Sequence, residues 1–136
     1  MKHTQGFSLV EVLVSIVVLS IALLGTAGLT AASLKSTNSS YYRSQATVLA
    51  DDILDRMRAN VTVARGGGYN IIGGDPPVFT AASGTAFFDV TEWSATVAQT
   101  LPGGEGDVTF ALGVATVVIT WGGADSPETF TTISQL

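Results

Sequence analysis

The chain reads GFSLVEVLVSIVVLSIALLGTAGLTAASL from Gly6 to Leu34, an apolar run that follows a short polar leader. The run carries one acidic residue, Glu11, near its start, and residues 12–34 contain no Asp, Glu, Lys or Arg. As a helix, residues 7–34 would reach about 42 Å, more than the ~30 Å hydrocarbon core of a bilayer. The length predicts a membrane-spanning helix. The carboxylate needs a separate explanation, because hydrocarbon cannot solvate it.

Two ordinary membrane segments explain this run less well. A secretory signal peptide has an apolar stretch of about 7–15 residues behind a basic start. This run is longer and follows a single lysine, Lys2, although small residues that could form a cleavage site occur at 25–27 and 30–32. A plain single-span anchor explains the length but gives no reason for Glu11.

The junction between leader and apolar run resembles the class III signal of type IV prepilins and type II secretion pseudopilins. In that family a prepilin peptidase cuts after the glycine, here Gly6, on the cytoplasmic side of the inner membrane. The new N-terminal residue, here Phe7, is then N-methylated. The fifth residue of the mature chain is a glutamate, here Glu11. The resemblance implies a leader over 1–6 and a single-pass protein whose head lies in the periplasm before assembly and later on the cell surface.

A charge argument gives Glu11 a role in this setting. Cleavage would leave a positive α-amino group on Phe7 at the tip of an apolar helix. Glu11 of a neighbouring subunit can pair with that charge, and removing either partner strands the other in a low dielectric. Such a pair would also fix the axial register of adjacent helices, as a buried polar residue does in coiled coils. Glu11 is therefore predicted to be an assembly residue and not a catalytic one.

Helical periodicity continues beyond the membrane segment, over residues 35–60. Apolar residues recur at intervals of three and four and form one stripe. The stripe consists of Tyr42, Ala46, Leu49, Ala50, Ile53, Leu54 and Met57. Asn60 and the glycines at 66–68 mark an end. We expect one helix from about Phe7 to Ala59 that buries this stripe against a domain.

The opposite face of the same segment is charged. Asp52 and Arg56 stand at i, i+4, and Asp55 and Arg58 at i, i+3, both favourable spacings. Asp51, Asp52 and Asp55 could be read as metal ligands. A solvated acidic face balanced by arginines explains them better, because no histidine is near.

Gly25 and Gly28 interrupt the apolar helix, and each costs about 1 kcal/mol relative to Ala. One interpretation is close helix packing, because Gly28 and Ala32 form a small-xxx-small pair. The other is local softening. Many major pilins place a helix-kinking proline in this stretch, whereas the first proline here is Pro76.

The remainder, residues 61–136, predicts a small head. Residues 65–84 are rich in Gly, Pro, Thr and Ala and indicate a long surface loop. Asp89 stands three residues before Glu92, which predicts a helix cap ahead of a short helix over 90–100. Pro102 would end that helix.

The period then changes to two. Val108, Phe110 and Leu112 alternate with Asp107, Thr109 and Ala111 before a turn at Gly113. A second alternating run follows, with Ala115, Val117, Ile119 and Trp121 on one face. A Thr-rich strand over 128–134 carries Phe130 and Ile133. These runs predict a three-stranded antiparallel meander whose apolar face covers the helix stripe, so the expected fold class is α+β and pilin-like.

Composition narrows the function. Eleven acidic residues against six basic ones argue against nucleic-acid binding. The chain has no cysteine, and its only histidine, His3, lies in the leader, so no catalytic set, metal site or cofactor site is expected. The glycines of 103–107 lack a phosphate-loop ending. Calcium held by the loop acids is a weaker alternative to turn chemistry. The four acids concerned are Glu105, Asp107, Asp125 and Glu128.

Four segments resemble PilV-type minor pilins more narrowly. They are VLSIALLG (18–25), RSQA (43–46), ADDILDRMRAN (50–60) and LPGGEG (101–106). The resemblance implies a low-abundance subunit that primes pilus assembly near the tip. Its implied partners are prepilin peptidase, other minor pilins, the major pilin, the assembly platform and a tip adhesin. A minor pseudopilin of type II secretion is the nearest alternative, and a membrane-anchored binding module with an uncut leader is another.

Overall fold

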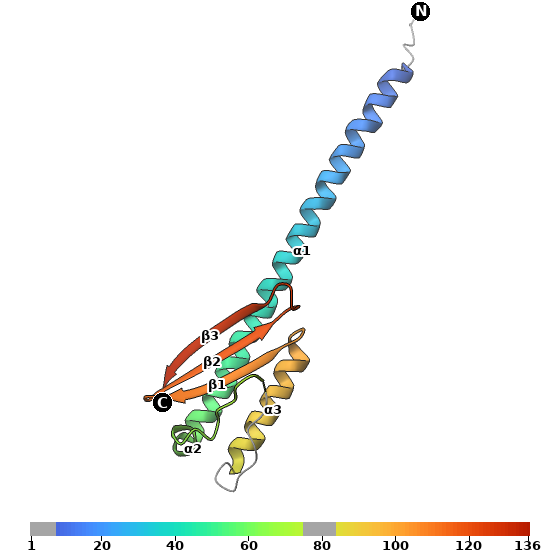
Figure 1. Ribbon diagram of the computed structural model, residues 1–136. Coiled ribbons are helices and arrows are strands. Elements are labelled where there is room, and N and C mark those ends of the chain that lie inside the picture. Colours follow the sequence, from blue (N-terminus) through green and yellow to red (C-terminus); the bar gives the residue numbers. More distant parts are fainter. Residues whose placement is uncertain (1–7, 75–83) are drawn as a thin grey trace, which may run out of the picture. The chain divides into compact units, whose positions relative to one another are not determined.

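The computed structural model describes residues 8–74 and 84–136, which form three helices and three strands (Figure 1). Their order is α1 (Leu9–Ala59), α2 (Val61–Arg65), α3 (Gly84–Thr100), β1 (Glu105–Ala111), β2 (Val114–Trp121) and β3 (Glu128–Gln135). The chain divides into two compact units, Met1–Ser40 and Tyr41–Leu136, and α1 runs through the boundary. The predicted α+β class, with a long N-terminal helix and a three-stranded antiparallel sheet, is confirmed.

The first unit contains the apolar part of α1. By length and composition this helix can cross a membrane, and none of its apolar window is buried. Hydroxyl side chains are satisfied inside the helix, because Ser15, Ser20 and Thr30 each donate to the carbonyl four residues earlier. The helix is continuous through Gly25 and Gly28, and a Cβ at either glycine would meet nothing within 4 Å. The segment thus has the internally satisfied backbone that a bilayer requires.

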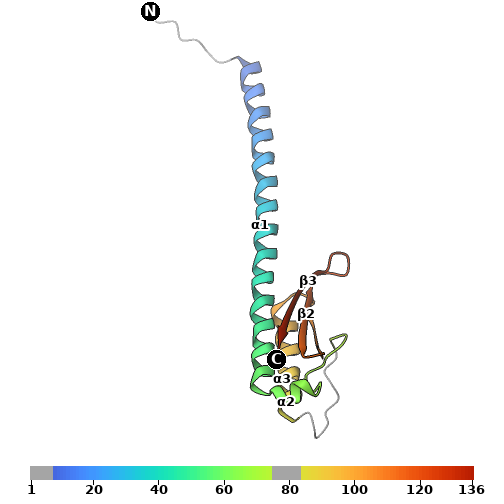
Figure 2. The ribbon, with the colours of Figure 1, turned by 90° about the vertical axis from the view of Figure 1, so that its left-hand side faces the viewer.

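The second unit is the head, and its core joins three layers of side chains. The predicted stripe of α1 is buried from Ala46 to Met57, and Tyr42 packs partly against it. Helix α3 contributes one face, composed of Ala86, Val90, Trp93 and Val97. The inner face of the sheet adds Val108, Ala115, Val117, Ile119 and Trp121. Figure 2 shows β2 and β3 beside the last turns of α1. Periodicity in the sequence therefore located most of the core.

The sheet has the order β1-β2-β3 with both pairs antiparallel, as predicted. Leu112 and Gly113 form the two-residue turn between β1 and β2, and both have positive φ, of 55° and 85°. The sequence pattern had placed Leu112 on the inner face of the first strand. This was wrong, because the turn begins one residue earlier and leaves the side chain fully exposed, at 102 %. Ile133 lies on the outer face of β3 and is 67 % exposed.

Two predictions for the middle of the chain need correction. Helix α3 begins at Gly84 and not at Val90, so Asp89 lies inside the helix and does not cap it. The carboxylate instead accepts a hydrogen bond from the Tyr69 hydroxyl, with 2.6 Å between the oxygens. The expected surface loop is also partly buried, because Tyr69 is fully inaccessible and Ile71 bridges Val108. Residues 75–83 of that loop lie outside the described residues.

The two tryptophans allow a matched test of one core hydrogen bond. The indole Nε1–H of Trp93 donates to the Leu49 carbonyl at 2.8 Å, joining α3 to α1. The buried Nε1 of Trp121 has no partner among residues 8–74 and 84–136. Because a net hydrogen bond contributes about 1 kcal/mol, we expect Trp93→Phe to cost roughly 1–2 kcal/mol more than Trp121→Phe. Urea unfolding of the full chain in detergent, followed by far-ultraviolet circular dichroism, measures both losses. Equal losses would contradict this assignment.

Candidate functional site

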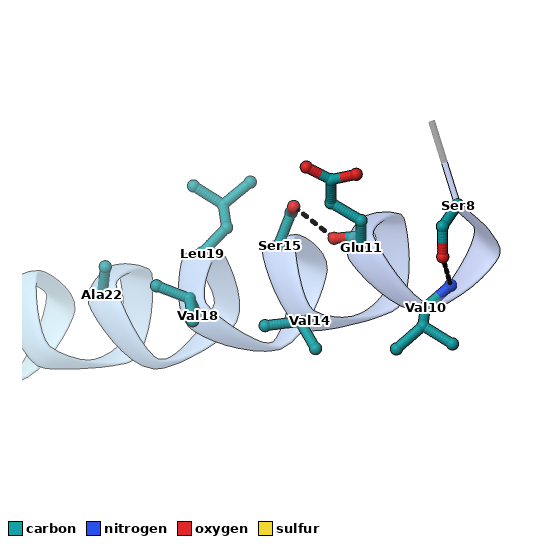
Figure 3. Close-up of a pocket in the computed structure, with 8 residues that line it drawn as sticks. All are labelled: Ser8, Val10, Glu11, Val14, Ser15, Val18, Leu19 and Ala22. Carbon is teal, nitrogen blue, oxygen red and sulfur yellow. Dashed lines mark hydrogen bonds between the residues drawn. The ribbon is translucent and has the colours of Figure 1, made fainter. Parts of the chain in front are cut away.

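The start of α1 carries the one predicted site residue that the structure describes. Ser8 precedes the helix, and its Oγ accepts a hydrogen bond from the Val10 N–H at 3.2 Å (Figure 3). The Ser8 carbonyl accepts from the N–H groups of Glu11 and Val12 at 3.0 and 3.2 Å. Ser8 therefore caps the helix and satisfies an N–H group that would otherwise lack a partner. Glu11 is placed in the first turn, where a carboxylate is favoured by the helix dipole.

Glu11 lies on a hollow strip of the helix surface. The strip is lined by Ser8, Val10, Glu11, Val14, Ser15, Val18, Leu19 and Ala22 (Figure 3). Three of these side chains are small, those of Ser8, Ser15 and Ala22. The Ser15 hydroxyl donates to the Glu11 main-chain carbonyl at 2.5 Å and so does not engage the carboxylate.

The Glu11 carboxylate has no hydrogen-bond or ion-pair partner within residues 8–74 and 84–136. A carboxylate in this position on an apolar helix is therefore available to a group from outside the described chain. The other two predicted site residues, Gly6 and Phe7, lie outside the described residues. Ser8 was not among the predicted site residues. Its signal was present, because Ser8 and Glu11 match the S-x-x-E pattern of a capping box before an apolar run.

In the head, a polar cluster around Arg56 joins α1 to α3. The guanidinium contacts Asp52 at 3.1 Å, as the i, i+4 spacing predicted, and also Glu92 at 3.0 Å and Asp89 at 3.5 Å. The hydrogen bond to Glu92, and then that to Asp52, raise the pKa of Arg56 against the opposing effect of burial. Burial first, and the bond to Asp89 second, raise the pKa of Tyr69 to about 12. Tyr69 is therefore neutral, and the acidic residues of the cluster are paired with Arg56. We interpret the cluster as a structural contact between α1 and α3.

The acidic residues considered as metal ligands have other roles. Asp55 pairs with Arg58 at 2.6 Å, and the Asp107 carboxylate accepts a hydrogen bond from the Gly74 N–H at 3.0 Å. Within the described parts of the chain, no three His, Cys, Asp or Glu side chains come together in a way that could hold a metal ion. The structure therefore does not gather the four loop acids into a calcium site.

Comparison with known proteins identifies the N-terminal segment. Residues 1–27 match the family model described as the prokaryotic N-terminal methylation motif. No curated protein and no solved structure matches the chain. The motif supports a type IV pilin-like or pseudopilin-like prepilin, a class of structural proteins and not of enzymes. It implies processing by prepilin peptidase and assembly with other pilins, and with the apolar helix it fits an inner-membrane anchor.

Proposed function

We propose that this protein is a minor pilin, processed between Gly6 and Phe7, that helps to prime type IV pilus assembly near the tip. The observation that carries the proposal is the match of residues 1–27 to the methylation motif, together with the Glu11 carboxylate, which lies five residues from the motif's glycine and has no partner among residues 8–74 and 84–136. The long helix and antiparallel sheet agree with a pilin-like subunit. The finer assignment to the pilus comes from the resemblance of residues 43–60 to PilV-type minor pilins.

The geometry around Glu11 supports helix-to-helix assembly. The hollow strip from Ser8 to Ala22 offers an exposed, mostly apolar surface to a second apolar helix, and its small residues Ser15 and Ala22 would let the two backbones approach at those positions. The amino group of a neighbour's mature N-terminus, placed over this strip, would reach the carboxylate. In a low dielectric an unpaired charge is costly, so the two helices are most stable where the amino group and the carboxylate meet. The pair therefore sets the axial register of the two helices.

Each segment of the chain has its own role in such a subunit. Residues 1–6 are a leader, 7–34 the membrane and filament-core helix, 35–60 its amphipathic continuation, and 61–136 the head. The head lies in the periplasm before assembly and on the pilus afterwards. Partners are prepilin peptidase, other minor pilins, the major pilin, the assembly platform and a tip adhesin.

Deletion of the gene tests the choice of filament system. Loss of surface pili and of twitching, with protein secretion intact, supports the minor pilin. The reverse pattern would assign the chain to a type II secretion pseudopilus, whose N-terminal signal has the same form. A membrane-bound protein whose leader, residues 1–6, stays uncut would instead be an anchored binding module.

Substitution of the leader glycine gives the largest effect on processing. We expect Gly6→Val to abolish cleavage, because a branched side chain would replace the hydrogen at the residue before the scissile bond. Mass spectrometry of the membrane-extracted protein should find only the precursor in the variant, and a chain that begins at N-methylated Phe7 in the wild type. Gly25→Ala, a glycine substitution within the helix, is the control and should be processed normally. Normal cleavage of Gly6→Val would disprove the assigned site.

A further inference from the structure

The two outer edges of the sheet differ in how their backbone groups are satisfied. On β1, the N–H of Val108 donates to the Ile71 carbonyl at 3.1 Å, and the N–H of Phe110 donates to the Asn70 Oδ1 at 2.8 Å. Ile71 also donates back to the Val108 carbonyl at 2.8 Å. Residues 70–71 therefore cover the edge of β1. Strand β3 has only β2 as a neighbour among the described residues.

The register shows which groups of β3 face outward. The N–H of Leu136 donates to the Gly113 carbonyl, and these two residues continue the β2–β3 register. In an antiparallel ladder such hydrogen-bonded pairs alternate with pairs whose N–H and C=O groups point away. Even-numbered residues of β3 thus bond to β2, and the odd-numbered ones direct their backbone groups to the open side. These are Thr129, Thr131, Ile133 and Gln135, which we call the open edge.

The open edge lacks the features that usually protect an exposed strand. Native edge strands carry lysine, proline or a bulge that prevents further pairing. Residues 128–135 contain no lysine, arginine or proline, their single charged residue is Glu128 at the first position, and all eight pair with β2 in one unbroken register. The four side chains of the open edge are uncharged and exposed. An unprotected edge of this length is a template for another extended strand.

We propose that the open edge of β3 is a docking site for an extended strand of a partner polypeptide, which adds to the sheet as a fourth, antiparallel strand. Its backbone would supply the donors and acceptors that the open edge lacks. The site lies wholly within the head and depends on neither the leader nor Glu11, so it stands apart from the proposed role in pilus assembly.

Charge defines the chemistry of the incoming strand. At the beginning of β3 lie two acids, Asp125 and Glu128. At its end lie two arginines. Arg58, which also pairs with Asp55 at 2.6 Å, donates to the Ser134 Oγ at 2.9 Å, and Arg65 donates to the Leu136 oxygen at 2.8 Å. An antiparallel strand that begins with an acidic residue and ends with a basic one would complement both ends.

A second copy of the chain is the less favoured occupant. Pairing of β3 with β3 of another copy would relate the heads by a two-fold axis, which reverses the direction of residues 41–59 in the second head. The formal net charge of −5 opposes association of two copies.

Amide exchange in the full chain tests the docking edge. The probe is the peptide acetyl-Glu-Thr-Val-Thr-Ile-Thr-Val-Lys-amide, added to the ¹⁵N-labelled protein in detergent micelles. We expect the amides of Thr129, Thr131 and Ile133 to exchange at least about tenfold more slowly when the peptide is bound. The peptide with its Glu and Lys exchanged should bind at least about fivefold more weakly, since its charges oppose those beside the edge.

Three variants make the test specific. Thr131→Pro removes one outward N–H that β2 does not use, and Ile133→Lys adds an edge charge; both should abolish the protection. Thr116→Lys places the same charge on the outer face of β2, whose two edges are both paired. This variant should keep the amide protection. Protection that is absent in the wild type, or unchanged in both edge variants, would overturn the proposal. A concentration-dependent dimer without peptide, lost in Thr131→Pro, would overturn it in favour of a second copy.

Discussion

Glu11→Ala is expected to leave leader cleavage intact and to lower the amount of this subunit in sheared filaments at least about 100-fold. Breaking a buried ion pair costs about 3–5 kcal/mol because the remaining charge is stranded, and about 1.4 kcal/mol corresponds to a factor of ten. Glu11 lies in the first turn with its carboxylate unpaired in the described chain, so removing it disturbs no internal contact. Quantitative mass spectrometry of filament and membrane fractions measures the ratio.

The matched control is Ser15→Ala, one turn further along the same hollow strip. Its hydroxyl bonds to the helix backbone and not to the carboxylate, so incorporation should stay near the wild-type level. Glu11→Gln keeps the shape of the side chain but removes its charge. The amount of this variant in filaments should therefore fall as far as that of Glu11→Ala. If both Glu11 variants are recovered in filaments at the wild-type level, the ion pair is not needed for assembly.

Gly106→Ala is expected to cause a large loss of stability in the head, about 3 kcal/mol by the cost of overpacking a filled core. A Cβ at Gly106 would lie 2.6 Å from Cζ3 of Trp93 and would also strike its Cη2. Neither side can yield easily, because Gly106 is held in the β1–β2 ladder opposite Ile119 and the Trp93 ring is fully buried. Urea unfolding of the full chain in detergent measures the loss.

Gly123→Ala is the control, because a Cβ there would meet nothing within 4 Å and its φ lies outside the left-handed region. It should change stability by less than about 0.5 kcal/mol. The double variant Gly106→Ala with Trp93→Phe should be less unstable than the sum of the two single losses, because the smaller ring relieves the clash. Strict additivity would show that the two residues do not collide.

The elements that the sequence predicted well are those with a strong local period. Apolar residues at intervals of three and four identified the buried stripe of α1, and alternation identified the inner face of β2 without error. Both patterns arise because one face of each element meets the core. The end of α1 at Ala59 was also predicted, since Asn60 and three nearby glycines follow it.

The errors arose where a distant contact overrides a local signal. Asp89 has the spacing of a helix cap, but Arg56 and Tyr69 bind it from 33 and 20 residues away. Ile71 lies in a segment with loop composition and is buried because it bridges β1. Leu112 continued an alternating pattern by one residue too many, and only the two-residue turn places it in solvent.

For the candidate site, sequence and structure contribute different parts. The roles of Gly6, Phe7 and Glu11 are predicted from residue types at fixed spacing, and all three lie within residues 1–27, which match the methylation motif. The structure adds the cap at Ser8, the hollow strip, and a Glu11 carboxylate that pairs with no group in the described part of the chain. The ion pair itself needs a second subunit, so it follows from neither a single sequence nor a single chain.

The most direct measurement is the identity of the N-terminal peptide of this protein in filaments sheared from the cell surface. The account predicts a peptide that begins at N-methylated Phe7, and no filament-associated peptide that begins at Met1. A protein found only in the membrane fraction, with residues 1–6 still attached, would contradict the assignment as a processed pilin.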